Sequence, residues 1–465
     1  MSTFIDHGAP RSLFTAAVAR HLSRAEAEAI AKQVLSYATA DETRVSITSG
    51  VTGNTRFAVN QISTAGDSYN NVVVVSSKFG KRSANAVTNK LDAASLKAVV
   101  ERAEALARLA PEDPEDMPEL GPQQYAETPA WSDATATMSP EARAAAVRTI
   151  TEQAVAEGLI STGYLEVEAN SYAVANSKGL FAYRRDTGTA LTTTVRTPDG
   201  TGSGWAGASE NDWTKIDPKA LGARAVQKAK ASMNPVAIEP GRYTVVLEPT
   251  AVANLVQLVM GSLSARNADE GRSFFSKPGG GTKLGMKVVD ERVTIYSDPT
   301  DPQAPGTPFT NEGLPTKRNV WVENGVVKAL NYDRYWAQQK GVAPTASGGG
   351  LVMLGGDSSL EAMIASTERG ILVTRLWYIR PVNPRTILFT GLTRDGTFLI
   401  ENGKITSSIK NMRWNESPIF LLNNIEAMGR SVRVSSSESG SAGFPVVVPP
   451  IKARDFNFTS LSDAV

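Results

Sequence analysis

The chain has 465 residues, which is too long for one ordinary hydrophobic core and favours two large domains. Hydrophobic residues make up 41% and charged residues 20%, and 48 Lys and Arg stand against 47 Asp and Glu, so we expect a globular protein with no broad basic surface. The chain has no cysteine, which excludes thiol nucleophiles and thiolate metal sites, and its two histidines, His7 and His21, both lie in the first 21 residues.

The N terminus carries no pattern typical of export. The first 30 residues contain no uninterrupted apolar stretch of the kind found in signal peptides, and no later segment approaches 18 consecutive apolar residues. We therefore expect a cytoplasmic protein. The balanced charge gives no reason to expect a nucleic acid or a membrane as a partner.

The first predicted element is a helix from about residue 25, because Ser23 and Glu26 form a capping box before an apolar-periodic run. Short runs of alternating polarity follow and predict the strands of an antiparallel meander. Glycines separate these runs and are predicted to form its turns: Gly50, Gly53 and Gly66.

A proline-rich stretch divides the predicted helices of the first half. Residues 91–110 have the spacing of an amphipathic helix that ends at Pro111. Residues 111–140 contain six prolines among acidic residues, which predicts an extended surface connection. Another helix is expected where Ser139 can act as the cap and Pro140 as the first helical residue.

Residues 164–207 are rich in β-branched and aromatic residues and predict strands, with hairpin turns at 177–179 and 199–200. A helix capped by Asp217 follows. Two pairs of helix- and strand-breaking residues, Asn-Pro and Pro-Gly, then flank a short stretch near residue 236 and predict a domain boundary there.

The second half is predicted to be mostly β. One apolar helix is expected at 250–263, and Asn-Gly turns at 324–325 and 402–403 predict two hairpins of type I′. A capping box of Ser358 and Glu361 predicts a short helix that Gly370 would end.

These patterns together predict an α+β fold. An N-terminal α/β domain with an antiparallel sheet and helices is expected over residues 1–235, including the proline-rich connection at 111–140. A C-terminal β-rich domain is expected over residues 236–465.

Two glycine-rich patterns bear on ligand binding. The GxGxxG string at 202–207 lacks the helix that a dinucleotide site needs directly after it, so we interpret it as part of a hairpin. The tracts at 278–281 and 347–350 could bring backbone amides close to a ligand, although mobile loops have the same composition. We favour loops at both positions.

Several separated segments resemble the TldD/PmbA family, historically called modulators of DNA gyrase, from about residue 25 to the C terminus. They are NSKGLFAYRRD near Asn176, YTVVLEPTAVANLVQLVMGSL near Tyr243, the run NEGLPTKRNVWVENGVVKALNYDRYWAQQKG from Asn311, GTFLIENGKI from Gly396, and the closing FPVVVPPIKARDF. In that family the TldD subunit carries a helix with the pattern HExxxH and a cysteine near the C terminus, and these side chains are understood to hold a catalytic metal.

The resemblance locates the equivalent positions in this chain. Counted without gaps from VVLEP, the HExxxH window begins at Gln257, places Leu258 at the general base and ends at Ser262. Counted back from the closing segment, the cysteine position falls on Ser437. Zinc needs three strong nitrogen, sulfur or carboxylate donors, so no metal, cofactor or catalytic residue is expected here.

The resemblance therefore implies the PmbA, or TldE, branch, whose members lack the metal residues and pair with a TldD subunit in a heterodimeric peptidase. We expect a non-catalytic subunit, inactive alone, that partners a metal-bearing TldD-like subunit in the proteolysis of unfolded peptides. The family also implies a barrel-like C-terminal domain, and peptides that enter a cavity between subunits and add as an extra strand to a sheet edge.

Two other functions stay open from the residues alone. One is a stand-alone peptide- or ligand-binding homodimer without peptidase activity, using the glycine-rich loops with Tyr332, Arg334 and Trp336. The other is carboxylate-based hydrolysis, although the sequence alone cannot show which two acidic residues lie together in the fold. Its candidate residues are Glu270, Asp290, Glu291, Glu312, Asp333, Asp357, Glu401 and Glu416.

Overall fold

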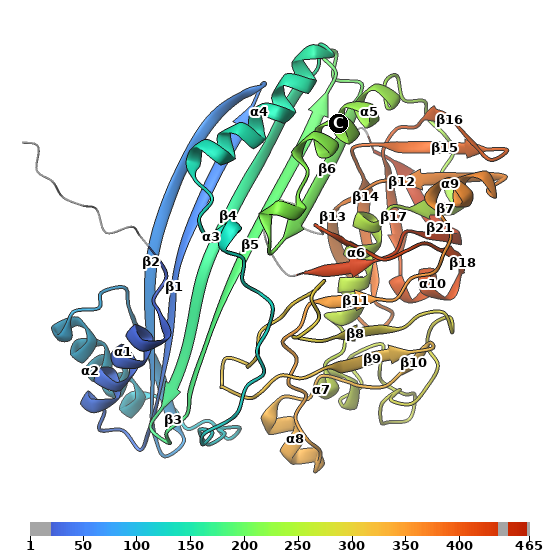
Figure 1. Ribbon diagram of the computed structural model, residues 1–465. Coiled ribbons are helices and arrows are strands. Elements are labelled where there is room, and N and C mark those ends of the chain that lie inside the picture. Colours follow the sequence, from blue (N-terminus) through green and yellow to red (C-terminus); the bar gives the residue numbers. More distant parts are fainter. Residues whose placement is uncertain (1–19, 436–444, 463–465) are drawn as a thin grey trace, which may run out of the picture.

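The computed structural model describes residues 20–435 and 445–462, which form three sheets and the helices packed on them (Figure 1). One six-stranded sheet belongs to the N-terminal half. A six-stranded and a nine-stranded sheet belong to the C-terminal half, where the larger sheet curls into a half-barrel. The fold is α+β, as the sequence predicts. Within the described residues, every helix is too short or too polar to span a bilayer.

The N-terminal sheet is antiparallel throughout, in the order β3-β2-β1-β4-β5-β6. Its central strands are long and pass from one end of this half to the other (Figure 1). The strands are β1 (Glu42–Ala58), β2 (Gln61–Phe79), β3 (Arg82–Thr88), β4 (Ile160–Asn176), β5 (Phe181–Arg196) and β6 (Ser203–Glu210).

The predicted glycine turns of the meander are wrong. Gly50 and Gly53 lie inside β1 and Gly66 lies inside β2, while the turn between these strands is at Val59 and Asn60, whose φ angles are 51° and 61°. The physical reason at Gly50 is crowding, because a Cβ there would lie 3.0 Å from the Cγ atom of the Asn170 side chain. Gly50 therefore marks a close approach by a neighbouring side chain and does not mark a turn.

Four helices cover one face of this sheet. Their starts agree with the predicted caps: Ser23 and Glu26 make a complete capping box, and the side chains of Ser139 and Asp217 accept hydrogen bonds from amides of the first turn. The helices are α1 (Arg24–Tyr37), α2 (Ala93–Leu109), α4 (Pro140–Ala156) and α5 (Pro218–Ala231); two short elements, α3 (Asp133–Ala136) and η1 (Trp213–Lys215), complete this half.

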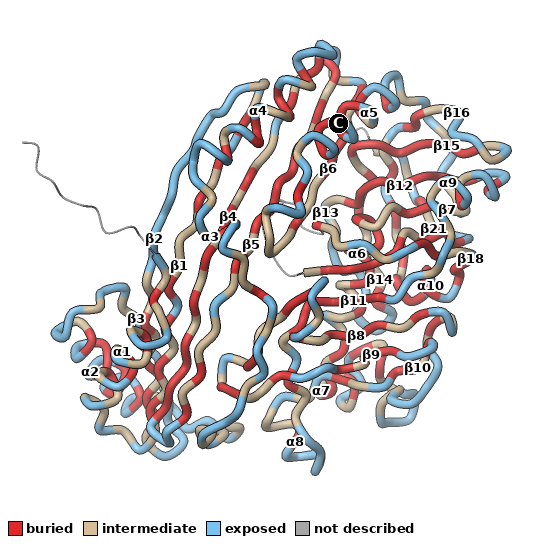
Figure 2. Tube along the Cα trace, viewed as in Figure 1, coloured by how far each residue is buried: buried red, intermediate tan, exposed pale blue. Residues whose placement is uncertain are grey.

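The two faces of the sheet differ because side chains alternate along each strand. Leu165 and Leu191 lie on the helix-covered face and pack against α4 and α5. The opposite face, which we call the inner face, carries Tyr164, Glu168 and Thr192 and lines cavities together with residues of the C-terminal half. Because these cavities are shared, the inner face is the side of the sheet that meets the C-terminal half. Residues 61–70, the first half of β2, are exposed, as Figure 2 shows.

The half-barrel sheet has the order β13-β14-β17-β21-β7-β12-β15-β16, with β18 paired to β21. Its strands are β7 (Gly241–Leu247), β12 (Arg369–Val373), β13 (Leu376–Asn383), β14 (Leu388–Thr393), β15 (Thr397–Glu401), β16 (Lys404–Ser408), β17 (Met412–Glu416), β18 (Ile425–Met428) and β21 (Ile451–Leu461).

The smaller sheet has the order β10-β9-β8-β11-β20-β19. Its strands are β8 (Ile295–Ser297), β9 (Asn319–Glu323), β10 (Val326–Val327), β11 (Leu351–Met353), β19 (Val432–Val434) and β20 (Val446–Val448). The helices of this half are α6 (Pro249–Met260), α7 (Ala265–Asp269), α8 (Arg334–Lys340), α9 (Leu360–Ala365) and α10 (Pro418–Asn423).

Both Asn-Gly hairpins are confirmed. Asn324 and Asn402 have φ angles of 49° and 51°, and each following glycine also has a positive φ, as type I′ turns require. The predicted capping box is wrong by one residue, because Ser359 caps α9 and the amide of Ser358 bonds to the carbonyl of Met428. Gly370 does not end this helix but lies in β12.

Candidate functional site

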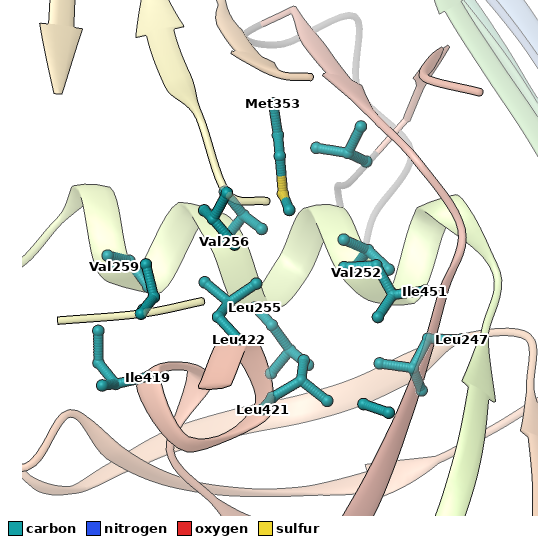
Figure 3. Close-up of a cluster of buried hydrophobic side chains, with 14 of the residues drawn as sticks. Leu247, Val252, Leu255, Val256, Val259, Met353, Ile419, Leu421, Leu422 and Ile451 are labelled. Atoms are coloured by element: carbon teal, nitrogen blue, oxygen red, sulfur yellow. The ribbon is translucent and has the colours of Figure 1, made fainter. Parts of the chain in front are cut away.

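Helix α6, in whose last turn the metal-equivalent window begins, is a core element of the C-terminal half (Figure 3). Leu255 and Val256 are fully buried in the largest hydrophobic cluster. Leu422 of α10 and Met353 of β11 belong to the same cluster, on different sides of the helix in Figure 3. Apolar residues therefore surround α6, and this packing fixes its position.

The window itself lies at the end of α6. Gln257 and Leu258 are half-buried on the last turn, and Leu258 packs against the hydrophobic cluster. The helix ends at Met260, and the hydroxyl of Ser262 donates a 2.9 Å hydrogen bond to the carbonyl of Leu258. The structure thus brings Leu258 and Ser262 together. Ser437 lies outside the described residues.

These three described positions do not fit a zinc ion. A side-chain amide, an aliphatic side chain and a hydroxyl are not the imidazole, thiolate or carboxylate donors that zinc takes. In residues 20–435 and 445–462, no group of three or more His, Cys, Asp or Glu side chains is placed to hold a metal ion. Leu258 has no proton acceptor, so it could not serve as a general base.

The one histidine within the described residues, His21, contacts a residue of the N-terminal half. His21 packs against Trp131, with ring centroids 4.7 Å apart. Burial lowers the pKa of His21, and the nearby charge of Arg185 lowers it further. His7 lies outside the described residues.

Most of the candidate carboxylates are engaged in hydrogen bonds or ion pairs that give them a structural role. Glu416 is buried and accepts the amides of Ser417 and Asn457, while Asp333 caps α8. The ion pairs of the others are Glu270 with Arg266, Asp290 with Arg292, Glu291 with Lys287 and Glu312 with Arg334. Glu401 accepts a hydrogen bond from Thr406, and Asp357 is exposed.

The two glycine tracts differ in environment. Gly279, Gly280 and Gly281 form an exposed turn in which all three have positive φ angles. Gly349, by contrast, is packed so closely that a Cβ would lie 2.6 Å from the amide nitrogen of Asp298. Trp336, proposed from the sequence to act with these loops, donates its indole N–H to Asp269 at 2.7 Å. The glycines of the second tract, at 347–350, therefore allow two loops to pack closely against each other.

The inner face carries a carboxylate pair that sequence patterns do not point to. A cavity of about 250 Å³ lies partway along β4 and β5, and Glu168, Asp186 and Arg433 are among its lining residues. Burial raises the pKa of Glu168, and the charges of Glu166 and Asp186 raise it further. The pKa of Asp186 is raised by burial as well, against the opposing charge of Arg184. Side-chain alternation places Glu168 and Asp186 on the same face of the sheet. The cavity around them also needs residues of the C-terminal half, which the sequence pattern does not reveal.

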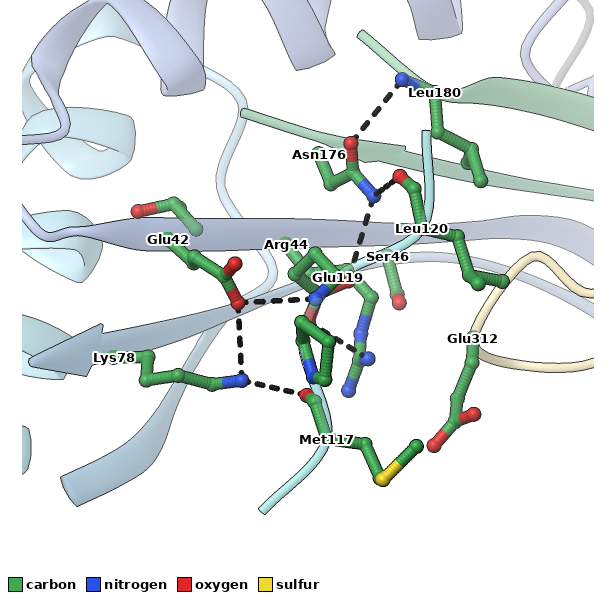
Figure 4. Close-up of polar contacts among 12 residues, drawn as sticks. Glu42, Arg44, Ser46, Lys78, Met117, Glu119, Leu120, Asn176, Leu180 and Glu312 are labelled. Carbon is green, nitrogen blue, oxygen red and sulfur yellow. Dashed lines mark hydrogen bonds and ion pairs between the residues drawn. The ribbon is translucent and has the colours of Figure 1, made fainter. Parts of the chain in front are cut away.

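The end of the inner face next to β3 is held by a polar network (Figure 4). The carboxylate of Glu42 contacts the ammonium of Lys78 at 3.1 Å and the amide of Glu119 at 3.0 Å, and it also pairs with Lys178. Burial opposes the ionisation of Glu42, but these hydrogen bonds outweigh it and hold its pKa at about 2. The network ties the proline-rich connection to β1 and β2.

The proline-rich connection in turn contacts the C-terminal half. Of the connection predicted at 111–140, residues 111–132 run without helix or strand, whereas the rest contains the short helix α3 and the first residue of α4. Asn176 donates to the carbonyl of Leu120 at 2.8 Å, and the hydroxyl of Tyr125 donates to the carbonyl of Gly313 at 2.8 Å. Tyr125 also packs against Phe309. The connection therefore links the sheet to a loop of the C-terminal half.

Comparison with known proteins assigns the chain to a family. Residues 133–233 match the PmbA/TldA metallopeptidase central domain, and residues 240–460 match the PmbA/TldA metallopeptidase C-terminal domain. A metalloprotease of Methanothermobacter thermautotrophicus is 25% identical over 64% of this chain and 70% of its own length. A metalloprotease of Archaeoglobus fulgidus is 26% identical over 51% of this chain and 58% of its own length.

The fold agrees with this assignment. The crystal structure of TldE from Thermococcus kodakarensis superposes with a TM-score of 0.81, covering 93% of this chain and 99% of that one at 22% identity. Because the identity is this low, the superposition speaks for the fold alone. The two matched domains and the shared fold together show that the chain belongs to the PmbA/TldD family.

Proposed function

We propose that this chain is the non-catalytic, TldE-like subunit of a TldD/TldE-type metallopeptidase that degrades unfolded peptides in the cytoplasm. The observation that carries the proposal is the donor set at the family's metal positions. Gln257, Leu258 and Ser262 offer an amide, a hydrocarbon and a hydroxyl, and Leu258 is engaged in core packing. The metal and the general base would then come from the partner subunit.

The packing of α6 supports a structural role for this helix. A catalytic metal site keeps an open coordination position that faces substrate. Here the hydroxyl of Ser262 is bonded to the backbone of the same segment, at 2.9 Å from the carbonyl of Leu258. Within this segment, Leu258 and Val259 pack in the hydrophobic cluster.

The test combines this chain with a metal-bearing TldD-like protein from the same organism. The chain alone should not hydrolyse an unfolded peptide. The mixture should elute as one complex in size-exclusion chromatography and should hydrolyse the peptide in a chelator-sensitive manner. Failure to associate at micromolar concentrations, or chelator-insensitive hydrolysis by the chain alone, would overturn the proposal.

A variant of this chain locates the metal within the complex. Replacing Gln257, Ser262 and Ser437 together by alanine should leave kcat of the assembled complex within about twofold, since none of them is proposed to bind the metal. A loss of tenfold or more with the complex still intact would place catalysis in this chain. The parent complex at the same metal content is the control.

A further inference from the structure

A second cavity of the inner face, of about 680 Å³, lies where the sheet meets the first residues of β13 and the β14–β15 turn. We call it the arginine cavity, because four arginines line it: Arg56, Arg196, Arg375 and Arg394. Its volume falls within the range of about 300–1,000 Å³ that ligand sites occupy.

One wall of the arginine cavity is fixed by buried contacts. The guanidinium of Arg375, almost fully buried, lies 3.0 Å from the carboxylate of Asp395 and 4.6 Å and 4.8 Å from the ring centroids of Trp205 and Trp377. Asp395 also accepts a hydrogen bond of 2.7 Å from the hydroxyl of Ser203. A guanidinium held between two indole rings and a carboxylate loses little further freedom when a ligand binds.

The opposite wall presents cations that the protein does not neutralise. Arg56 is exposed and its guanidinium lies 5.7 Å from the ring centroid of Tyr164, while Arg196 lies at the end of β5. Within the described ranges, no ion pair joins Arg56 or Arg196 to a carboxylate. These two side chains are therefore available to an anion from outside.

The charge of the whole lining is positive. Its four guanidinium groups stand against two carboxylates, Glu166 and Asp395, which leaves a net charge of +2. The planar guanidinium fork matches the geometry of a carboxylate and binds it through two parallel hydrogen bonds. The hydroxyls of Thr192 and Thr194 and the faces of Trp377 and Tyr164 offer contacts for the group that carries the carboxylate.

We infer that the arginine cavity binds the carboxylate of an unfolded peptide, with Arg56 and Arg196 as its direct partners. The carboxylate can come from the C terminus of the peptide or from an Asp or Glu side chain. This inference rests on the proposed function only in taking the ligand to be a peptide. It assigns to this chain a recognition site that holds substrate by charge, at a distance from any metal held by a partner subunit.

The test measures binding to the full-length chain by titration calorimetry. Three forms of one unstructured hexapeptide are compared: one with a glutamate and a free C terminus, its C-terminal amide, and its Glu→Gln variant. Binding of the first form is expected, and a loss of tenfold or more in one of the other two identifies the source of the carboxylate. No binding of the first form, or undiminished binding of a peptide that carries both changes and so has no carboxylate, overturns the inference.

Variants connect the binding to the cavity. Arg56→Gln and Arg196→Gln should each weaken binding of the first peptide by about fivefold or more, and Arg196→Lys, which keeps the charge, should restore part of the loss. Arg148→Gln removes an exposed arginine on α4, on the far face of the sheet, and should bind normally. Each variant is checked for an unchanged Tm. Equal losses in Arg56→Gln and Arg148→Gln would overturn the inference.

Inorganic phosphate is titrated as a competitor to test for a site that takes any anion. Phosphate that binds more tightly than the peptide would overturn the assignment to a peptide carboxylate. The result is also separable from the proposed function. A complex that assembles and hydrolyses peptide while the chain alone binds none refutes only the cavity, whereas peptide binding without association refutes only the subunit role.

Discussion

The guanidinium of Arg143 on α4 crosses strand β1 at Gly53 and pairs with the carboxylate of Asp67 on β2. The Arg143 side chain is 2% exposed, whereas that of Asp67 is 46% exposed. A Cβ at Gly53 would lie 2.7 Å from the carboxylate oxygen of Asp67 and would also collide with the guanidinium. The missing side chain at Gly53 is what lets the helix reach across one strand to the next.

Gly53→Ala should therefore lower the free energy of unfolding by roughly 1–3 kcal/mol, because the added methyl group overpacks the passage of Arg143. Gly66→Ala is the matched control, since it also lies within a strand but a Cβ there has no neighbour within 4 Å. Removal of a glycine from a strand is itself mildly stabilising, so this control should be neutral or slightly more stable. Equal losses in urea denaturation of the two variants would contradict the crowding argument.

Glu42 should make stability depend on acid pH. Its pKa of about 2 in the folded chain lies below its ordinary value of 4.5, so its contribution to the free energy of unfolding is complete above pH 4.5 and is lost as the pH falls through 2. Glu42→Gln should lower that free energy by on the order of 2–3 kcal/mol at pH 7.

The pH series supplies the check on Glu42. The difference between the parent and Glu42→Gln should be constant from pH 7 to pH 5 and should shrink as the pH falls to 3, when measured by urea denaturation. Glu291→Gln removes an exposed carboxylate paired with Lys287 and should change stability by less than about 0.5 kcal/mol. A difference for Glu42→Gln that grows below pH 4.5 would refute the assigned sign.

Asn176 should be essential for the attachment of the proline-rich connection. Its side-chain oxygen accepts the amide of Leu180 at 3.1 Å and its amide group donates to the carbonyl of Leu120. Asn176→Ala leaves both backbone groups without this partner, so we expect a loss of roughly 2–4 kcal/mol and faster proteolysis within residues 111–132. Asn89→Ala is the control. Asn89 is exposed, so a protease should cleave this variant at the same rate as the parent chain.

Two substitutions in α6 should reduce stability by different amounts, because the two leucines differ in burial. Leu255 is fully buried, so Leu255→Ala should lower the free energy of unfolding by roughly 2–5 kcal/mol through lost burial and a residual cavity. Leu258 is only half-buried, and Leu258→Ala should cost less. Thermal or urea unfolding of the two variants provides the comparison, and a larger loss for Leu258 would contradict the placement of this helix.

Some local signals predicted local structure correctly. The box of Ser23 and Glu26 and the Asn-Gly turn at 402–403 depend only on neighbouring residues, and both formed as predicted. Gly50 and Gly53 were wrongly predicted to form turns. Glycine is needed there because the side chains of Asn170 and Arg143, more than 80 residues away in the sequence, leave no room for a Cβ. Sequence spacing contains no information about such encounters.

The same limit applies to the candidate sites. The metal-equivalent positions at 257–262 could be located because they form one contiguous segment with a known pattern. The arginine cavity could not, since its arginines range from Arg56 to Arg394 and come from separate strands and turns of both halves. Nothing in the local sequence around these four arginines indicates that the fold will bring them together around one cavity.

The long ladder between β1 and β4 has a consequence for synthesis on the ribosome. About 100 residues separate the end of β1 from the start of β4, so at about 5–20 residues per second the nascent chain waits roughly 5–20 seconds for that partner. Throughout that interval the hairpin of β1 and β2 presents an open edge. Gly50, Gly53 and the charge of Arg56 along that edge make it a poor template for another emerging polypeptide.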